Sequence, residues 1–293
     1  FGAAPGAQDN TDAFLWALDA ARQAGGGTVY VPAGNYRFAG ELVVPSGVEL
    51  RGCFDVPHHT ISAGSVLMPT SGRGDENGTP FIRLEPGSGL RGLTVWYPEQ
   101  DMANIVPYPW AVQGLGPGCW LLDVTMGNAY QGVDFWTYPS EGHLVRYLAG
   151  AYFRRGLFIS KCGGDGWVED TQFNPHYAAR LHPSLPRAGE SWDPMLRYMW
   201  EHLDGIVFGR CEREHVRGTF LYAAYDGLAF RDDGGGANAR LIQHGTDAGS
   251  RGVVLEAAGP DGLEFINAQI VHFGPREQAA LVVDEAFTGE ARF

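Results

Sequence analysis

The chain has 293 residues and a formal net charge of −13 at pH 7, and it contains 42 glycines and 18 prolines. Its hydrophobic content of 44% is typical of a globular protein, and no apolar run reaches the roughly 20 residues that a membrane-spanning helix needs. The acidic balance argues against a nucleic-acid partner, because contacts with phosphate backbones require clustered basic residues. We therefore expect a globular protein with many turns and with neither a nucleic-acid nor a membrane partner.

The cysteines show no spacing that indicates a metal site. They stand at Cys53, Cys119, Cys162 and Cys211, without the close pairs that are typical of zinc ligands. Small buried core residues are the simpler interpretation, because free cysteine is among the most buried residue types. We expect no metal and no cofactor, and the spacing leaves open whether the cysteines pair.

The first thirty-two residues predict a helix followed by a strand. Residues 9–12 (Asp-Asn-Thr-Asp) offer helix N-cap side chains, and Phe14 and Leu18 follow at helical spacing. Glycines at positions 25–27 end this helix, and residues 28–32 (Thr-Val-Tyr-Val-Pro) have the composition of a strand.

Three later segments are distinguished by their composition. Residues 42–52 predict two short strands about a Pro-Ser-Gly turn, whereas residues 53–81 are polar and rich in Gly, His and Pro and predict an extended loop. Residues 181–201 interrupt the strand pattern, and their second part predicts a short helix with an N-cap at Ser191 or Asp193. Because insertions in repeat folds concentrate on the binding face, we expect this one beside a groove.

One six-residue pattern recurs along the chain. Residues 203–208 read Leu-Asp-Gly-Ile-Val-Phe, and residues 225–230 read Tyr-Asp-Gly-Leu-Ala-Phe. Gly-led strands of this kind start at positions 132, 156, 205, 227 and 252, with a weaker one near Ala279. The steps are 24, 49, 22, 25 and 27 residues, and with the step of 49 taken as two turns the period is roughly 22 to 27 residues. Companion strands lie at 167–171, 214–218, 239–243 and 263–267. Such a period predicts a coil of strands stacked turn on turn.

The motifs near the N-terminus resemble the opening of pectate-lyase-like and polygalacturonase-like proteins. The resemblance covers Phe-Gly-Ala at 1–3, Asp-Asn-Thr-Asp at 9–12, Gly-Gly-Gly-Thr-Val-Tyr-Val-Pro-Ala-Gly-Asn-Tyr at 25–36 and Pro-Ser-Gly-Val-Glu-Leu-Arg-Gly at 45–52. It implies an all-β fold, a single-stranded right-handed parallel β-helix with an N-terminal capping α-helix and a short helical insertion. We expect one domain over residues 1–293, with the cap at 1–27 and the insertion at 181–201.

That superfamily includes lyases, hydrolases and phage tail spikes, so the resemblance specifies a fold more sharply than an activity. It implies a carbohydrate substrate and a secreted or periplasmic location, although no signal peptide is visible in the chain.

The recurring pattern places two carboxylates one turn apart, at Asp204 and Asp226. Adjacent parallel strands lie about 4.8 Å apart, so matching side chains on successive turns can flank a glycosidic bond as acid and base. Asp before Gly is also a common turn arrangement, in which the carboxylate binds local N–H groups. Both interpretations stay open from the sequence alone. Asp232, in a Gly-rich turn one strand further on, is a third catalytic candidate with the same ambiguity.

The same segment resembles the polygalacturonase pattern in which an Asn-Thr-Asp turn precedes an Asp-Asp-Cys turn by about one coil. Asp204 stands where the first Asp of that pattern falls, and Asp226 stands in the Asp pair. This chain has Tyr225 in place of one Asp of the pair, Ser-Arg-Gly at 250–252 in place of Gly-His-Gly, and no Arg-Ile-Lys. The resemblance therefore does not extend to galacturonate specificity.

Several further side chains are candidates for substrate binding. Aromatic rings stack on the apolar faces of sugars, and outward polar groups on strands and turns can hydrogen-bond hydroxyls. Loop packing explains aromatic residues near turns equally well, and a lone histidine is more often structural. The candidates are Asp134, Trp136, Tyr138, Asn174, His176, Tyr177, Trp200 and Arg251.

Three functions follow from these candidates. The first is a glycoside hydrolase that cleaves a poly- or oligosaccharide with Asp204 and Asp226 as its acid/base pair. The second is a polysaccharide lyase that acts on a uronate-containing glycan by β-elimination, with its base among Arg155, Arg251, His176 and Tyr177, since Lys161 is the one lysine of the chain. The third is a non-catalytic, carbohydrate-binding or tail-spike-like β-helix. The oligomeric state stays open.

Overall fold

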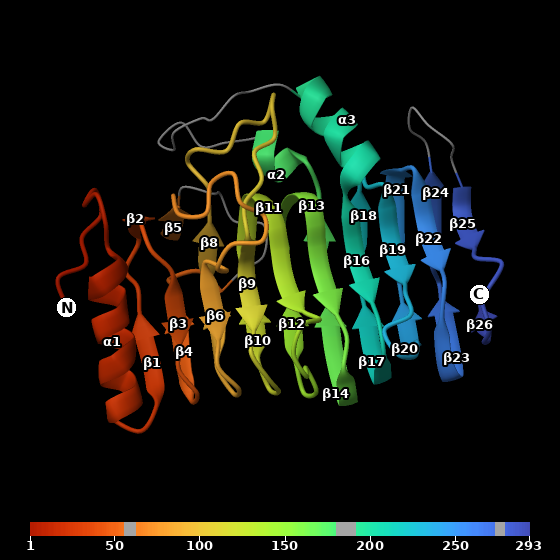
Figure 1. Cartoon of the computed structure of the whole chain (residues 1–293), viewed down its shortest axis with the longest axis horizontal. Helices are drawn as coiled ribbons and strands as arrows, with labels where there is room; N and C mark the ends of the chain where they lie inside the picture. Colours follow the sequence, from red (N-terminus) through yellow and green to blue (C-terminus); the bar gives the residue numbers. More distant parts are fainter. Residues whose placement is uncertain (56–62, 180–191, 273–278) are drawn as a thin grey trace.

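The protein is a long coil of parallel strands, stacked turn on turn from the N-terminus to the C-terminus (Figure 1). The structure is a computed structural model that describes residues 1–55, 63–179, 192–272 and 279–293. Within these residues every strand pairing is parallel. This is the right-handed parallel β-helix that the N-terminal motifs implied.

The strands form three rows along the coil, each row containing about one strand per turn. The first row is the ten-stranded sheet of β1 (Gly27–Tyr30), β4 (Val48–Arg51), β7 (Gly89–Arg91), β10 (Trp120–Leu122), β12 (Leu144–Arg146), β14 (Cys162–Glu169), β17 (Cys211–Arg217), β20 (Ala237–Ile242), β23 (Ala258–Ile266) and β26 (Ala291–Arg292). The predicted companion strands of the later turns fall in this row.

The second row runs through β2 (Gly34–Phe38), β5 (Ser65–Pro69), β8 (Leu93–Val95), β11 (Thr125–Phe135), β13 (Ala149–Ile159), β15 (Gln172–Phe173), β18 (Phe220–Tyr222), β21 (Gly245–Gly249) and β24 (Gln269–His272). The third row runs through β3 (Leu42–Val44), β6 (Ile82–Leu84), β9 (Trp110–Gly114), β11, β13, β16 (Asp204–Phe208), β19 (Asp226–Phe230), β22 (Arg251–Leu255) and β25 (Ala279–Val283). Because β11 and β13 are 11 residues long, each spans both rows.

The Gly-led strands of the sequence pattern are the third row, and their apolar residues stack in register inside the coil. One inward column is made of Val133, Leu157, Ile206, Leu228 and Val253, each paired with the next across adjacent strands. All five are fully or almost fully buried. The period read from the sequence is therefore the length of chain in one turn, and it aligns like residues of successive turns. The step of 49 residues from position 156 to position 205 is one turn and not two, because β13 pairs directly with β16 and the chain between them also contains α2 and α3.

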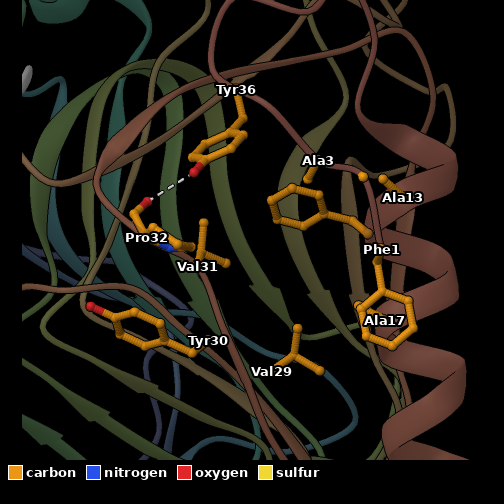
Figure 2. A pocket seen from close by; sticks show the side chains of 11 residues that line it. Phe1, Ala3, Ala13, Ala17, Val29, Tyr30, Val31, Pro32 and Tyr36 are labelled. Carbon is orange, nitrogen blue, oxygen red and sulfur yellow. Dashed lines mark hydrogen bonds between the residues drawn. The ribbon is translucent and has the colours of Figure 1, made fainter.

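Helix α1 (Thr11–Gln23) lies at the N-terminal end of the stack, beside β1 (Figure 1). Its buried Phe14 packs edge-on against Phe38, with ring centroids 4.8 Å apart. A cavity of about 180 Å³ lies between this helix and β1, with Ala17, Val29 and Tyr36 among its lining residues (Figure 2). In it the Tyr36 hydroxyl donates to the Pro32 carbonyl at 3.1 Å (Figure 2). The helix occupies the place expected of a cap, and the single-domain organisation stays a prediction.

The prediction of an extended loop over residues 53–81 is wrong for the middle of that segment. Strand β5 occupies Ser65–Pro69, all five residues are buried, and the strand pairs with β2 and β8. The apolar run Val66–Met68 is too short to stand out within a polar segment, yet it supplies one full turn of the second row. Residues 56–62 of this segment lie outside the described residues.

Two helices stand on the coil beside β11, β13 and β16 (Figure 1). Helix α2 covers His176–Ala179, and helix α3 covers Trp192–His202 and buries Met195, Leu196 and Met199. The helix predicted for the insertion is therefore present, although residues 181–191 lie outside the described residues. None of the described helices has the length and apolar composition needed to cross a bilayer.

Candidate functional site

The outer side of the third row carries an apolar stripe beside a charged column. Phe158, Val207, Ala229 and Val254 are in register on β13, β16, β19 and β22 and form a small cluster separate from the main core. Trp110 packs edge-on against Phe158 at 5.5 Å, and the Arg155 guanidinium lies 5.9 Å from the Trp110 ring. The stripe and the column therefore share one face of the coil.

The charged column contains the two predicted carboxylates. In register across β13, β16, β19 and β22 stand Arg155, Asp204, Asp226 and Arg251. The sequence prediction that Asp204 and Asp226 are neighbours on successive turns is therefore confirmed as geometry.

Asp226 is fully buried and held by two arginines. Its Oδ1 accepts from Arg251 Nε at 2.5 Å, and its Oδ2 accepts from Arg251 Nη2 at 2.7 Å and from Arg231 Nη2 at 3.1 Å. The side chain has no exposed surface. Such a bidentate fork is the strongest arrangement available to a carboxylate, and it leaves neither oxygen open to a substrate.

Asp204 is held in the same way by a different pair. Arg231 Nη2 lies 3.2 Å from Oδ1, and Oδ2 accepts from Arg231 Nη1 at 3.3 Å and from Arg154 Nη1 at 3.4 Å. Only 11% of the Asp204 side chain is exposed. We call Arg154, Arg231 and Arg251 with these two aspartates the arginine cluster.

The arginines of the cluster remain charged in this environment. Burial works to lower the pKa of Arg231, but Asp204 and Asp226 stabilise the cation and raise that pKa above its usual range. Arg251 shows the same balance, and its guanidinium also lies over the Tyr225 ring, 4.5 Å from the centroid. The cluster therefore presents cations rather than carboxylates at the surface.

Helix α3 brings two more titratable groups to the edge of this cluster. Arg154 Nη1 donates to the His202 carbonyl at 2.9 Å, which places Arg154, one-third exposed, against the C-terminal end of the helix. The exposed His202 ring lies 4.4 Å from the Tyr198 ring, measured between centroids. The insertion thus stands next to Asp204, and its place beside a groove stays a prediction.

A chain of hydrogen bonds leads inward from Tyr198. Its hydroxyl donates to the Tyr130 hydroxyl at 3.5 Å, and Tyr130 donates to Glu76 Oε2 at 3.0 Å. Burial, together with Tyr198 and Glu76, raises the pKa of Tyr130, so this phenol stays protonated. The chain can therefore pass a proton from the half-buried Tyr198 towards a carboxylate.

Sequence reasoning missed these residues for identifiable reasons. Tyr198 and His202 are four residues apart and share one face of α3, and this spacing in an insertion is a signal that could have been read. Glu76 reaches Tyr130 across 54 residues, and no local pattern marks that pair.

Two other predicted carboxylates serve turns. Asp232 is exposed, and its Oδ1 accepts from the Gly235 N–H at 2.8 Å. Asp134 is almost fully buried and accepts four hydrogen bonds, from the Trp136 and Thr137 N–H groups, the Thr137 hydroxyl and the Gln113 amide. Such bonds are typical of turn-forming aspartates.

The predicted residues around α2 form a separate group. Asn174 Oδ1 accepts from the His176 N–H at 3.0 Å and lies 2.6 Å from His176 Nδ1, while the Tyr177 hydroxyl donates to Gln172 at 3.2 Å. The His176 ring lies 4.8 Å from Trp192, at the start of α3. Because α3 rises about 1.5 Å per residue, its start lies about 15 Å from its end at the arginine cluster. These residues are too far away to share one reacting centre with that cluster.

The three predicted aromatic contacts differ in exposure. Trp136 packs against Phe158 at 5.9 Å, and Trp200 donates its indole N–H to the Ala248 carbonyl. Tyr138, which is 42% exposed, leaves the largest part of its ring free for a ligand.

Comparisons with known proteins agree with the fold. The first structural neighbour is a tailspike protein of E. coli bacteriophage HK620 in complex with a pentasaccharide, with a TM-score of 0.61 and 11% identity over 96% of this chain and 49% of that chain. An exopolygalacturonase from Thermotoga maritima matches with a TM-score of 0.50 and 14% identity over 93% of this chain and 74% of that one. The resemblance to pectate-lyase-like and polygalacturonase-like proteins is thus confirmed at the level of the fold.

One curated protein is similar in sequence. Alginate lyase 7 from Azotobacter vinelandii is 35% identical over an aligned length of 102 residues, and the match covers 31% of this chain and 11% of that protein. No protein-family model matches the chain. The chain therefore spans about half of the tailspike protein and about one tenth of the length of its curated relative.

Proposed function

We propose that the protein is a polysaccharide lyase that cleaves a uronate-containing glycan by β-elimination at the arginine cluster. One observation carries the proposal. Both oxygens of Asp226 are bound to guanidinium groups, whereas the partly exposed groups of the cluster are its three arginines. Tyr198 and His202 of α3 lie at its edge. A hydrolase needs accessible carboxyl groups, and a lyase needs a cation and a base.

The exposed groups match the parts of an elimination. Withdrawal of the C5 proton of a uronate is favoured when a cation neutralises the carboxylate of that sugar, and the arginine cluster supplies the cation. His202 takes the proton, or Tyr198 takes it while its own hydroxyl proton passes through Tyr130 to the Glu76 carboxylate. The C4–O4 bond then breaks, a C4–C5 double bond forms, and the leaving oxygen takes up a proton.

The comparisons support the substrate class. Alginate lyase 7 is named for action on a uronate polymer, and the tailspike protein was solved with a bound pentasaccharide. We propose a carbohydrate substrate on this basis, together with a secreted or periplasmic location, where such polymers are met. Sugar units further along the polysaccharide would contact Trp136, Tyr138 and the residues near α2.

The experiment is product analysis on a panel of acidic and neutral glycans. We expect the ultraviolet absorbance of an unsaturated uronate to rise with an acidic glycan. The variant Tyr198→Phe should lower kcat by about 10²- to 10⁴-fold, the range typical of a lost acid/base group. The matched control is Tyr30→Phe, an exposed tyrosine on β1 at the far end of the coil. Full activity in Tyr198→Phe, His202→Gln and their double variant would exclude this base assignment.

Hydrolysis by Asp204 and Asp226 is the second candidate, because the two carboxylates are in register on adjacent strands. It predicts new reducing ends without an unsaturated product. Asp204→Asn should then abolish turnover, while Asp232→Ala, in an exposed turn, leaves it intact. Binding of glycans without either product would identify a non-catalytic β-helix.

A further inference from the structure

A second polar cluster lies inside the coil, at the first row. His143 precedes β12, Cys162 begins β14, and Cys211 and Glu214 belong to β17, so the cluster joins three successive turns. All four residues are at most 2% exposed. We call them the inner cluster, and the proposal below is independent of the proposed function.

Hydrogen bonding fixes the orientation of the histidine. His143 Nδ1 lies 2.7 Å from the Ser140 carbonyl, which can only accept, so Nδ1 carries a proton. Nε2 therefore faces Glu214 Oε1 at 3.0 Å. One ligand atom each from His143, Cys162 and Glu214 lie within 4.8 Å of one another. A backbone carbonyl behind the ring is also the arrangement that orients metal-binding histidines.

One carboxylate oxygen of the inner cluster has no partner within the described residues. Within the described part of the chain, Glu214 Oε2 is buried and has no conventional hydrogen-bond partner. The Cys211 thiol is close enough to interact with both Cys162 and Glu214, which adds a second sulfur. The backbone leaves room for these groups at Gly166, where a Cβ atom would lie 2.2 Å from His143 Cε1 and 2.5 Å from Glu214 Oε2.

We propose that the inner cluster binds a zinc ion through His143 Nε2, Cys162 Sγ and a Glu214 oxygen, which already lie within 4.8 Å of one another, and that the neighbouring Cys211 Sγ closes in as the fourth ligand. Zinc prefers four tetrahedral ligands of nitrogen, sulfur and oxygen type, which is the set assembled here. The ion would displace the thiol protons and satisfy the unpaired carboxylate oxygen. Four protein ligands leave no position for a substrate, so the site would be structural.

The proposal also explains the absence of a sequence signal. The ligands are spread over residues 143–214 and meet only because successive turns of the coil stack. Complete burial means that the metal would enter while the chain folds rather than afterwards.

The test begins with the full chain, refolded with zinc or with cobalt and freed of excess metal. We expect about one zinc per chain by elemental analysis. The cobalt form should show a thiolate-to-metal charge-transfer band and the visible bands of a tetrahedral ion. The zinc-loaded chain should also unfold at a higher urea concentration than the chain refolded with a chelator.

Variants locate the ion. Cys162→Ser and Glu214→Gln should lose the cobalt bands and most of the bound zinc. The control Cys119→Ser should keep both, because Cys119 is equally buried but interacts with backbone carbonyls elsewhere in the coil.

Two results would overturn the proposal. One is wild-type protein that folds equally well with zinc and with chelator, without bound metal or cobalt bands. The other is Cys162→Ser that retains zinc and cobalt bands at the level of Cys119→Ser. If Cys162→Ser fails to fold, the comparison of wild-type protein refolded with zinc and with chelator decides the question.

Discussion

The arginine cluster on the outside of the coil and the inner cluster both form through the stacking of successive turns, but they differ in whether their carboxylate oxygens have partners. In both, register between successive turns brings together side chains that are distant in sequence. Outside, each oxygen of Asp226 has a guanidinium partner. Inside, an oxygen of Glu214 has no hydrogen-bond partner among the described residues. In the outer cluster the arginines outnumber the two carboxylates that they neutralise, so one positive charge is left over. In the inner cluster the unpaired carboxylate oxygen would be satisfied by a cation from solution.

The largest expected effect tests the neutralisation of the outer cluster. Asp226→Asn keeps the size of the side chain but leaves Arg251 without its buried counter-charge and Arg231 with Asp204 alone. Breaking a buried ion pair from one side typically costs about 3–5 kcal/mol, and partial exposure of the arginines favours about 3 kcal/mol here. Urea unfolding followed by tryptophan fluorescence measures this loss.

The control is Asp165→Asn, which removes an exposed partner of Arg213 on the first row. Exposed pairs contribute little to stability, so this variant should unfold at nearly the wild-type urea concentration. If both variants unfold at the same urea concentration, the burial of Asp226 contributes nothing to stability, and its ion pairs do not hold the outer cluster together.

The second effect tests whether buried polar groups inside the coil make the fold sensitive to acid. His244 is fully buried, with Nδ1 2.7 Å from the Thr219 hydroxyl, and burial lowers its pKa to about 4. In the unfolded chain its pKa is about 6.5, so between these values the unfolded state binds the proton more tightly. Stability is therefore fully present above about pH 6.5 and is lost as the pH falls, by about 3 kcal/mol at pH 4.

Unfolding free energies of wild type and His244→Gln across pH 4 to 7 provide the measurement. The variant should lose that part of the pH dependence which belongs to His244. His202→Gln, a substitution of an exposed histidine, should leave the wild-type dependence unchanged. An identical acid response in wild type and His244→Gln would contradict the assignment.

The repeat and the register were readable from the sequence, because the period of the Gly-led strands is the length of one turn. Asp204 and Asp226 could be paired for that reason. Their partners could not be predicted, since Arg154 and Arg251 come from the turns before and after and meet the aspartates only through side-chain conformation. A charged column in a β-helix is therefore predictable in position and unpredictable in how its charges pair.

Other misses have a similar cause. Strand β5 was hidden because its apolar residues are few and its flanks are polar. The inner cluster was missed because cysteine spacing identifies metal sites only when the ligands are close in sequence, as in tight loops. In a coil the relevant neighbours lie one turn away, so Cys162 and Cys211 are partners across 49 residues of chain, 211 minus 162.

The smallest effect tests how tightly the inner cluster is packed. Gly166→Ala would place a methyl group against His143 and Glu214, whose positions are fixed by hydrogen bonds and burial. Overpacking of this kind typically costs about 1–3 kcal/mol. Gly163→Ala is the matched control on the same strand, because a Cβ atom there meets nothing within 4 Å.

Zinc should enlarge the difference in unfolding free energy between the two variants, since ligands held by the ion cannot move aside. Equal unfolding free energies of the two variants, in both zinc-loaded and zinc-free protein, would mean that the inner cluster adapts to an added methyl group as easily as the exposed surface does. That result would contradict the tight packing on which the comparison of the two clusters rests.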